Sequence, residues 1–163
     1  MVNPVRVPIE QLPHARGLPF PVYQTAGSAG LDLQAAIQGT EVLAPGARLA
    51  IPTGIRIALP PGSEAQIRPR SGLALKKGLT MINAPGTIDS DYRGEIKVSL
   101  VNLGQERVVI QRGMRIAQMV VAPVLRVAWD GDRVLDDTAR GDGGFGSTGE
   151  GINSGEIVKE KAG

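Results

Sequence analysis

A polar segment at residues 83–94 holds the side chains best suited to chemistry, because an amide, two carboxylates and a phenol occur within it. Pro85 and Gly86 predict a tight hairpin there. On such a hairpin Asn83 can read the edge of a nucleobase, and Asp89 can hold a water molecule as a general base. An ordinary polar hairpin with a surface Asp–Arg pair is an equally good interpretation of this spacing alone.

A second candidate is the segment at residues 140–149, half of which is glycine. The backbone N–H groups and hydroxyls of such a loop can surround phosphate groups, and Arg140 adds a bidentate phosphate partner. No lysine follows the glycines, so this is not a Walker motif. Composition alone favours a flexible tail. Phe145 favours binding, because a ring in a glycine-rich arm needs something flat to cover, such as a nucleobase.

Two shorter segments add candidates of opposite charge. Residues 29–33 place Asp32 between two leucines, so the carboxylate faces away from the core if this is a strand. Taken alone, a solvent-facing aspartate is the commoner explanation. Residues 71–78 begin with the cap-type Ser71 and end with two lysines and a glycine, which predicts a short helix. The N–H groups at its start would face Arg70 and favour an anion.

The elements that must position these residues are strands. Apolar residues alternate with polar ones at 55–59 and 96–100, the period of a strand with one buried face. Proline and glycine turn signals separate these runs from similar, shorter ones at 48–51, 65–67, 79–82, 108–110 and 116–121. Short strands at intervals of about 8–12 residues predict an all-β sandwich or barrel without crossover helices.

The pattern of strands stops after Leu135, and this sets the predicted domain organisation. A length of 163 residues suits one domain. We therefore predict a β-domain at residues 1–138 and a mobile C-terminal arm at residues 139–163, rich in glycine and polar residues.

Composition excludes several classes of chemistry. The chain has no cysteine and a single histidine, His14, which excludes disulfides, thiolate metal sites and histidine metal clusters. No secretory signal or membrane span is visible, so we expect a cytoplasmic protein. The net charge of +2 is too small for a sequence-independent nucleic-acid binder. Basic residues are in excess at 64–115, which suits a small polyanion, although on charge alone a solvated mixed-charge surface is the commoner explanation.

Five segments in this order resemble the five motifs of the trimeric dUTP diphosphatases, or dUTPases. The matching segments are residues 29–33, 69–74, 83–94, 113–118 and 140–149. The resemblance implies an all-β, dUTPase-like jelly roll, in the form of a distorted barrel, with one short helix and a flexible arm. It also implies a homotrimer whose subunits share each active site. The implied reaction converts dUTP and water to dUMP and pyrophosphate with Mg²⁺, which keeps uracil out of DNA and supplies the precursor of thymidylate.

The resemblance also implies residue roles. Asp89 is similar to the general base that directs water at the α-phosphorus, and Asp32 to the residue that holds the water ligands of Mg²⁺. Asn83 resembles the uracil reader and Tyr92 the residue against deoxyribose. The expected phosphate ligands outside the arm are Arg70, Ser71, Gly72 and Gln118. The expected contacts from the arm are Arg140 with the γ-phosphate, Phe145 over the uracil ring, and Gly146, Ser147 and Thr148.

Two alternatives of function remain open at this point. The first is a dCTP deaminase of the same fold, either monofunctional or bifunctional. The second is a non-catalytic nucleotide-binding regulator, which could dispense with Asp89. The role of Arg115 is also open, because it could support the site electrostatically or pair with a carboxylate at a subunit interface.

Overall fold

The computed structural model describes residues 4–144, and all of its strands and helices lie before residue 127. There are eleven strands, one α-helix and one 3₁₀ turn in this part of the chain. The strands are β1 Ile9–Gln11, β2 Leu31–Gln34, β3 Thr40–Leu43, β4 Arg48–Pro52, β5 Ile55–Ile57, β6 Ser63–Arg68, β7 Leu79–Met81, β8 Gly86–Ile88, β9 Lys97–Asn102, β10 Val108–Gln111 and β11 Arg115–Pro123. The helix α1 is Ser71–Lys77, and the 3₁₀ turn is Pro13–Ala15.

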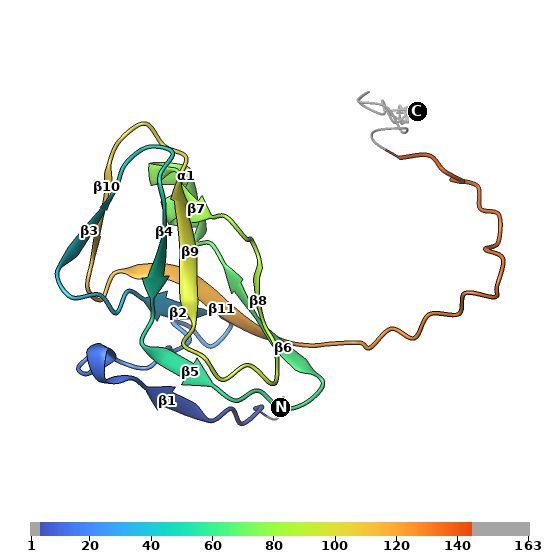
Figure 1. The fold of residues 1–163 in the computed structure, drawn as a ribbon, viewed down its shortest axis with the longest axis horizontal. Helices are drawn as coiled ribbons and strands as arrows, with labels where there is room; N and C mark the ends of the chain where they lie inside the picture. Colours follow the sequence, from blue (N-terminus) through green and yellow to red (C-terminus); the bar gives the residue numbers. More distant parts are fainter. Residues whose placement is uncertain (1–3, 145–163) are drawn as a thin grey trace, which may run out of the picture. The chain divides into compact units, whose positions relative to one another are not determined.

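The strands form four small antiparallel sheets. The largest has the order β2-β11-β6-β8, and a second has the order β4-β9-β7. The remaining strands form the pairs β1-β5 and β10-β3. In Figure 1 the β4-β9-β7 sheet crosses in front of β2 and β11. The described residues thus form an all-β fold, as predicted, but they do not close into a barrel.

The core lies between the two larger sheets and is aliphatic. Side chains from both sheets meet there, including Leu33, Ile67 and Met119 from one, and Val98 and Leu100 from the other. Each such side chain contributes about 1.5–3 kcal/mol on full burial. No aromatic side chain belongs to this core within residues 4–144. The whole chain has two Phe, two Tyr and one Trp, and aliphatic side chains fill the core instead.

A buried amide ties two loops to this core. Asn102 is fully buried, and its Nδ2 donates to the carbonyl oxygens of Leu43 (2.9 Å) and Glu106 (2.7 Å). Its Oδ1 accepts from the N–H of Gly104 at 2.9 Å. A buried amide is tolerated because its polar atoms are satisfied. Gly104 also packs against the end of α1, at Gly78, where a Cβ on either residue would meet backbone atoms of the other segment.

The strand predictions from alternation are confirmed, and the missed strands show why alternation sometimes fails. Strands β4, β5, β6, β7, β9, β10 and β11 match the predicted runs. Alternation did not reveal β1 or β3, since β3 buries only Leu43 among its four residues. The predicted hairpin at 83–94 is confirmed in its flanking strands, since β7 and β9 pair antiparallel with each other. The connection between them is longer than a tight turn and contains β8, which pairs with β6.

The predicted helix is confirmed with one correction at its start. α1 begins at Ser71, but the N-cap residue is Arg70 and no side-chain cap bond forms, so Ser71 does not cap the helix. The helix ends as predicted at Gly78, whose φ of 65° is the left-handed conformation that glycine adopts without strain. Its N–H donates to the carbonyl of Ala74.

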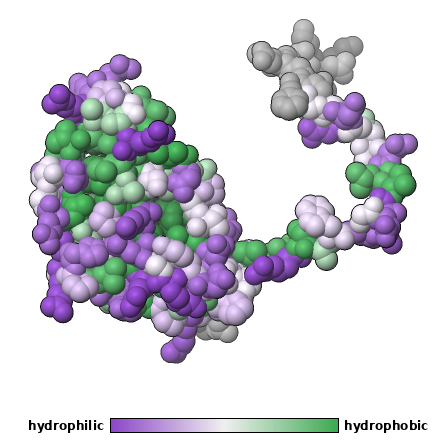
Figure 2. Space-filling model, viewed as in Figure 1, coloured by the Kyte–Doolittle hydropathy of each residue, from purple (hydrophilic) through white to green (hydrophobic). Residues whose placement is uncertain are grey.

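Contacts divide the chain into two compact units, Met1–Arg126 and Val127–Gly163. Residues 127–144 contain turns but no strand or helix. The arm boundary at residue 139 stays a prediction. None of the helices in residues 4–144 has the length and apolar character needed to cross a membrane, and the predicted cytoplasmic location also stays a prediction. Figure 2 shows hydrophobic side chains reaching the surface of the strand-bearing unit among hydrophilic ones.

Candidate active site

A cavity of about 610 Å³, which we call the Asp32 cavity, lies on the outer face of the β2-β11-β6-β8 sheet beside the start of α1. Strand alternation explains its composition, since Leu33 and Met119 point into the core while their neighbours point outward. The cavity brings together the predicted site residues Asp32, Arg70, Ser71, Gly72 and Gln118. Arg68, Lys76 and Lys77 also line it. Its surface is therefore strongly cationic.

Asp32 is held between two arginines. Its Oδ1 lies 2.9 Å from Arg70 Nε, and its Oδ2 lies 3.2 Å from Arg115 Nη1. The Asp32 side chain is 13% exposed, so water screens these pairs less than it screens a surface ion pair. Arg70 Nη1 also donates to the Arg115 carbonyl at 3.2 Å. Arg115 thus pairs with Asp32 within one chain.

Gln118 reaches the cavity because Gly30 leaves room for it. Gln118 Nε2 donates to the Pro69 carbonyl at 3.0 Å, next to Arg70. A Cβ at Gly30 would lie 2.5 Å from Gln118 Oε1, closer than two such atoms can approach. Gly30, in the segment 29–33, therefore leaves the space that the side-chain amide of Gln118 occupies.

A second cavity of about 240 Å³, which we call the Asp89 cavity, contains the predicted residues Asn83, Asp89 and Tyr92. Glu95 and Lys97 also line it. Asp89 follows β8 directly and is exposed. Among residues 4–144 no side-chain hydrogen bond or ion pair engages its carboxylate, and its backbone carbonyl accepts from the Tyr92 N–H at 3.1 Å. A free carboxylate in a cavity is available to a water molecule.

Tyr92 is fixed by the turn that follows it. Its hydroxyl donates to the Glu95 carbonyl at 3.1 Å. The ring lies so close over Gly94 that a Cβ there would collide with the hydroxyl and the ring. Arg93 supports the same turn, because its Nη1 donates to the carbonyls of Ser90 (2.7 Å) and Tyr92 (2.8 Å). The surface Asp–Arg pair considered from the sequence does not form here.

The two cavities lie on opposite faces of β6. Ile67 lines the Asp89 cavity, while the next residue, Arg68, lines the Asp32 cavity. Successive side chains of a strand point to opposite faces. One chain therefore does not bring Asp32 and Asp89 into the same cavity.

A metal ion would find few protein ligands in either cavity. Residues 4–144 contain no group of three or more His, Cys, Asp or Glu side chains that could hold one. A metal held mainly by water and substrate oxygens would need only one carboxylate from the protein.

Comparison with known proteins identifies the family. The dUTPase family model matches residues 17–149. The chain belongs to the dUTPase family. Two curated relatives carry the name deoxyuridine 5'-triphosphate nucleotidohydrolase. The one from Rhizobium meliloti (strain 1021) is 58% identical over 141 residues, covering 85% of this chain and 88% of the relative. The one from Bartonella quintana (strain Toulouse) is 59% identical over 156 residues, covering 89% and 84%.

Solved structures of dUTPases have the same fold. The Staphylococcus bacteriophage 80alpha dUTPase with dUPNHPP has a TM-score of 0.76 at 24% identity, covering 88% of this chain and 98% of that one. A mutant dUTPase from phage phi11 of S. aureus, described with a structural Mg(II) ion, has a TM-score of 0.71 at 20% identity, covering 81% and 99%. These likenesses confirm the predicted dUTPase-like jelly-roll fold.

The predicted contacts from the dUTPase arm are only partly within the described residues. Arg140 Nε donates to the Gly143 carbonyl at 2.9 Å, and the Gly141 N–H bonds to Thr138 Oγ1 at 3.1 Å. These bonds form a local turn in the second unit. The predicted contacts Phe145, Gly146, Ser147 and Thr148 lie outside the described residues.

Sequence reasoning missed several residues of the dUTPase cavities. Arg68 lines the Asp32 cavity, and Glu95 and Lys97 line the Asp89 cavity. For Arg68, the alternation of residues 65–67 offered a usable signal, because it places the following residue on the outer face. For Glu95 no local signal exists, since its side-chain partners are Gly54 and His14, far away in the sequence.

Proposed function

We propose that this chain hydrolyses dUTP to dUMP and pyrophosphate. Membership in the dUTPase family and the names of the relatives support the reaction. The mechanism rests on the difference between the two cavities. The Asp32 cavity is cationic and contains the predicted phosphate ligands, and the Asp89 cavity contains a carboxylate without an ion-pair partner among the described residues. This pairing suits the hydrolysis of a polyanion better than binding alone.

The triphosphate occupies the Asp32 cavity in this proposal. Arg70, Ser71, Gly72 and Gln118 present donors to phosphate oxygens, and Arg68, Lys76 and Lys77 add positive charge. Arginine and amide donors bound to anionic oxygens form strong, directional hydrogen bonds. The nucleoside occupies the Asp89 cavity, with Asn83 at the uracil edge and Tyr92 against the deoxyribose. Arg140, Phe145, Gly146, Ser147 and Thr148 complete the site from the arm.

The chemical step assigned to this chain is proton removal from water. Asp89 accepts a hydrogen bond from a water molecule and takes its proton as the oxygen attacks the α-phosphorus, so pyrophosphate leaves. The Asp89 carboxylate is suited to this task because no ion pair engages it among the described residues, although Lys97 lines the same cavity. Asp32 is not suited, since two arginines already engage it.

Asp32 is the residue that would hold Mg²⁺, through the ion's water ligands. Each carboxylate oxygen can accept more than one hydrogen bond, so Asp32 can accept from a coordinated water while keeping its arginine partners. Mg²⁺ tends to retain several waters and to take further oxygens from phosphates, and this fits a cavity with one carboxylate. The bound ion would neutralise charge on the phosphates.

We further propose a homotrimer with active sites shared between subunits. The position of the two cavities on opposite faces of β6 supports it, because one chain cannot offer both to a single nucleotide. Exposed apolar side chains on the strand-bearing unit, such as Phe20, Val22 and Val42, also support assembly. The Asp32 cavity of one subunit then faces the Asp89 cavity of another.

A substrate panel tests the reaction. The protein is incubated with dUTP, dCTP, dTTP or UTP and Mg²⁺, and pyrophosphate and ammonia are measured. Pyrophosphate from dUTP alone is the expected result. Release of ammonia from dCTP would select the deaminase instead, and a protein that binds dUTP without turnover would be a regulator.

Mixing two impaired variants tests the shared site. Asp89→Asn and Arg70→Ala damage different cavities, so subunits mixed during assembly recover intact sites, about one quarter of the total with random association in a closed ring. The matched control mixes Asp89→Asn with Asn83→Ala, which lie in the same cavity and should not restore activity. Failure of the first mixture to exceed the second would contradict sharing.

A further inference from the structure

Glu95 joins the Asp89 cavity to the N-terminal part of the chain. Its side chain is 15% exposed, and a carboxylate this sheltered requires partners. Glu95 Oε1 accepts from the Gly54 N–H at 2.8 Å and from His14 Nε2 at 2.7 Å. An ionised carboxylate only accepts hydrogen bonds, so the imidazole is the donor. His14 and Glu95 are 81 residues apart in sequence.

The backbone of Glu95 holds a residue of the nucleoside side of the site. The Tyr92 hydroxyl donates to the Glu95 carbonyl, as described above, and the ring packs against Gly94. Glu95 itself lines the Asp89 cavity. A shift of Glu95 would therefore move the hydrogen-bond acceptor on which the Tyr92 hydroxyl rests.

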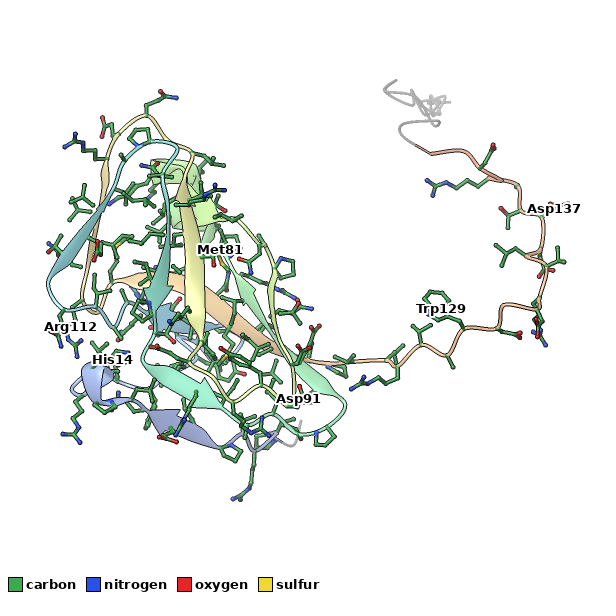
Figure 3. The ribbon with its side chains drawn as sticks, in the orientation of Figure 1. His14, Met81, Asp91, Arg112, Trp129 and Asp137 are labelled. Carbon is green, nitrogen blue, oxygen red and sulfur yellow. The ribbon has the colours of Figure 1, made fainter. Side chains whose placement is uncertain are left out.

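The segment that carries His14 is held in place by Arg112. Arg112 Nη1 donates to the carbonyls of His14 (2.7 Å) and Ile37 (3.2 Å), and its Nη2 donates to the carbonyl of Arg16 (2.9 Å). Figure 3 shows His14 and Arg112 next to each other at the edge of the strand-bearing unit. One guanidinium thus fixes the backbone on both sides of Ala15, and His14 projects from a rigid segment toward Glu95.

We propose that the His14–Glu95 pair is a positioning device that fixes Tyr92 for discrimination between deoxyribose and ribose. The inference rests on the proposed function, in which Tyr92 lies against the sugar. Neither His14 nor Glu95 touches the reacting atoms in this scheme. They act through the acceptor carbonyl of Glu95 and the turn that carries Tyr92.

The test compares kcat/KM for dUTP with kcat/KM for UTP in each variant. Glu95→Ala removes both hydrogen bonds to Oε1, and His14→Ala removes one of them from the other side. We expect the ratio for dUTP over UTP to fall about 10- to 100-fold in Glu95→Ala, the effect of a small displacement in a positioned site. Glu95→Gln retains an acceptor oxygen for the Gly54 N–H and should recover part of the ratio.

The matched control is Glu10→Gln. Glu10 pairs with Arg56 across β1 and β5 at 2.7 Å, but both side chains are much more exposed, at 57% and 45%. It should change the ratio by less than about twofold, as is usual for a surface substitution. Thermal unfolding of every variant is measured alongside, because general loss of structure lowers kcat/KM for both substrates without changing their ratio.

A double variant of His14 and Glu95 shows whether the two residues act together on the dUTP-over-UTP ratio or independently. If the pair acts as a unit, Glu95→Ala in combination with His14→Ala should have nearly the same ratio as Glu95→Ala alone. An unchanged ratio in a wild-type-like, dUTP-hydrolysing background would overturn the inference and leave the proposed function intact. A wild-type chain that does not hydrolyse dUTP would overturn both.

Discussion

The Asp32 cavity contains the carboxylate predicted to hold a metal, and the Asp89 cavity contains the carboxylate predicted to act as the general base. The two carboxylates differ in the partners that surround them. Asp32 is engaged by Arg70 and Arg115, in a cavity that Arg68, Lys76 and Lys77 make cationic. Asp89 shares its cavity with Glu95 and Lys97, and Glu95 is already engaged by Gly54 and His14. The charge of Asp32 is thus compensated within its cavity, whereas no side chain of residues 4–144 engages the Asp89 carboxylate.

This difference separates binding from activation. The oxygens of Asp32 already contact two arginines, so fewer of their hydrogen-bonding positions are open to an attacking water molecule. The same arrangement leaves the remaining cations available to a triphosphate. A carboxylate without a cation can take a proton from water, but it would repel phosphates if it had to bind them. In the proposed homotrimer, the two functions lie on opposite faces of β6 in each chain, and a second subunit brings the two cavities together.

The largest expected effect is that of Asp89→Asn. The amide keeps the shape of the side chain but cannot take a proton, so kcat should fall about 10²–10⁴-fold, the usual contribution of a positioned general base. Steady-state kinetics with dUTP and binding of a non-hydrolysable dUTP analogue measure the two quantities separately. Binding should be nearly unchanged.

Asp91→Asn is the matched control for this variant. Asp91 lies two residues further along and does not line the Asp89 cavity. Its kcat should stay close to that of the unmodified chain. Equal losses in the two variants would mean that the charge of the whole turn matters, and that Asp89 has no special role.

The next effect is that of Arg70→Ala in the other cavity. Loss of a charged hydrogen bond to phosphate costs about 1.5–3 kcal/mol, or roughly a 10- to 150-fold rise in KM. Arg115→Ala is the comparison, because Arg115 also contacts Asp32 but does not line the cavity. If the two variants raise KM equally, Arg70 acts by holding Asp32 and does not contact the phosphates.

Much of the fold could be predicted from the sequence, because strand periodicity is a local property. Strand β9 alternates Val98 and Leu100 with outward residues, and this pattern identified it directly. Strand β3 could not be found in this way, because it lies at an edge and buries one side chain. Proline and glycine indicated the connection at 83–94, which joins the paired strands β7 and β9, but they do not specify that this connection contains β8 or that β8 joins β6 in another sheet.

The candidate site was predictable residue by residue, but its division into two cavities was not. The ordered motifs resembled those of dUTPases and so supplied Asp32, Arg70 and Asp89. Which of these share a cavity depends on strand alternation in β6 and on sheet order, which no motif encodes. The arginine partners of Asp32 and the histidine partner of Glu95 come from distant segments and appear only once the chain is folded.

A smaller effect is expected from adding one methyl group beneath a polar side chain in each cavity. Gly30→Ala displaces Gln118 Oε1 in the Asp32 cavity, and Gly94→Ala displaces the Tyr92 hydroxyl in the Asp89 cavity. Each change disturbs one neutral hydrogen bond, worth about 0.5–1.5 kcal/mol, so kcat/KM for dUTP should fall about 2- to 10-fold.

The two variants should differ in their selectivity for dUTP over UTP. Gly30→Ala should affect dUTP and UTP alike, and Gly94→Ala should reduce the preference for dUTP. The same change in selectivity for both would contradict separate phosphate and nucleoside cavities.

The smallest effect, that of Lys76→Gln, tests whether the Asp32 cavity attracts its ligand through charge at long range. Lys76 lies in the exposed part of α1 and lines the cavity without an ion-pair partner among residues 4–144. Exposed charges contribute about 0.2–1 kcal/mol, so KM for dUTP should rise no more than about fivefold at low ionic strength. At about 1 M salt the Debye length falls to about 3 Å, and the difference from the unmodified chain should disappear.

Lys97→Gln, in the Asp89 cavity, is the counterpart. A nucleoside carries no charge for Lys97 to attract. The KM of Lys97→Gln for dUTP should therefore change less with salt concentration than the KM of Lys76→Gln. A salt dependence of equal size in both variants would mean that the phosphates feel both cavities, and the electrostatic distinction between them would fail.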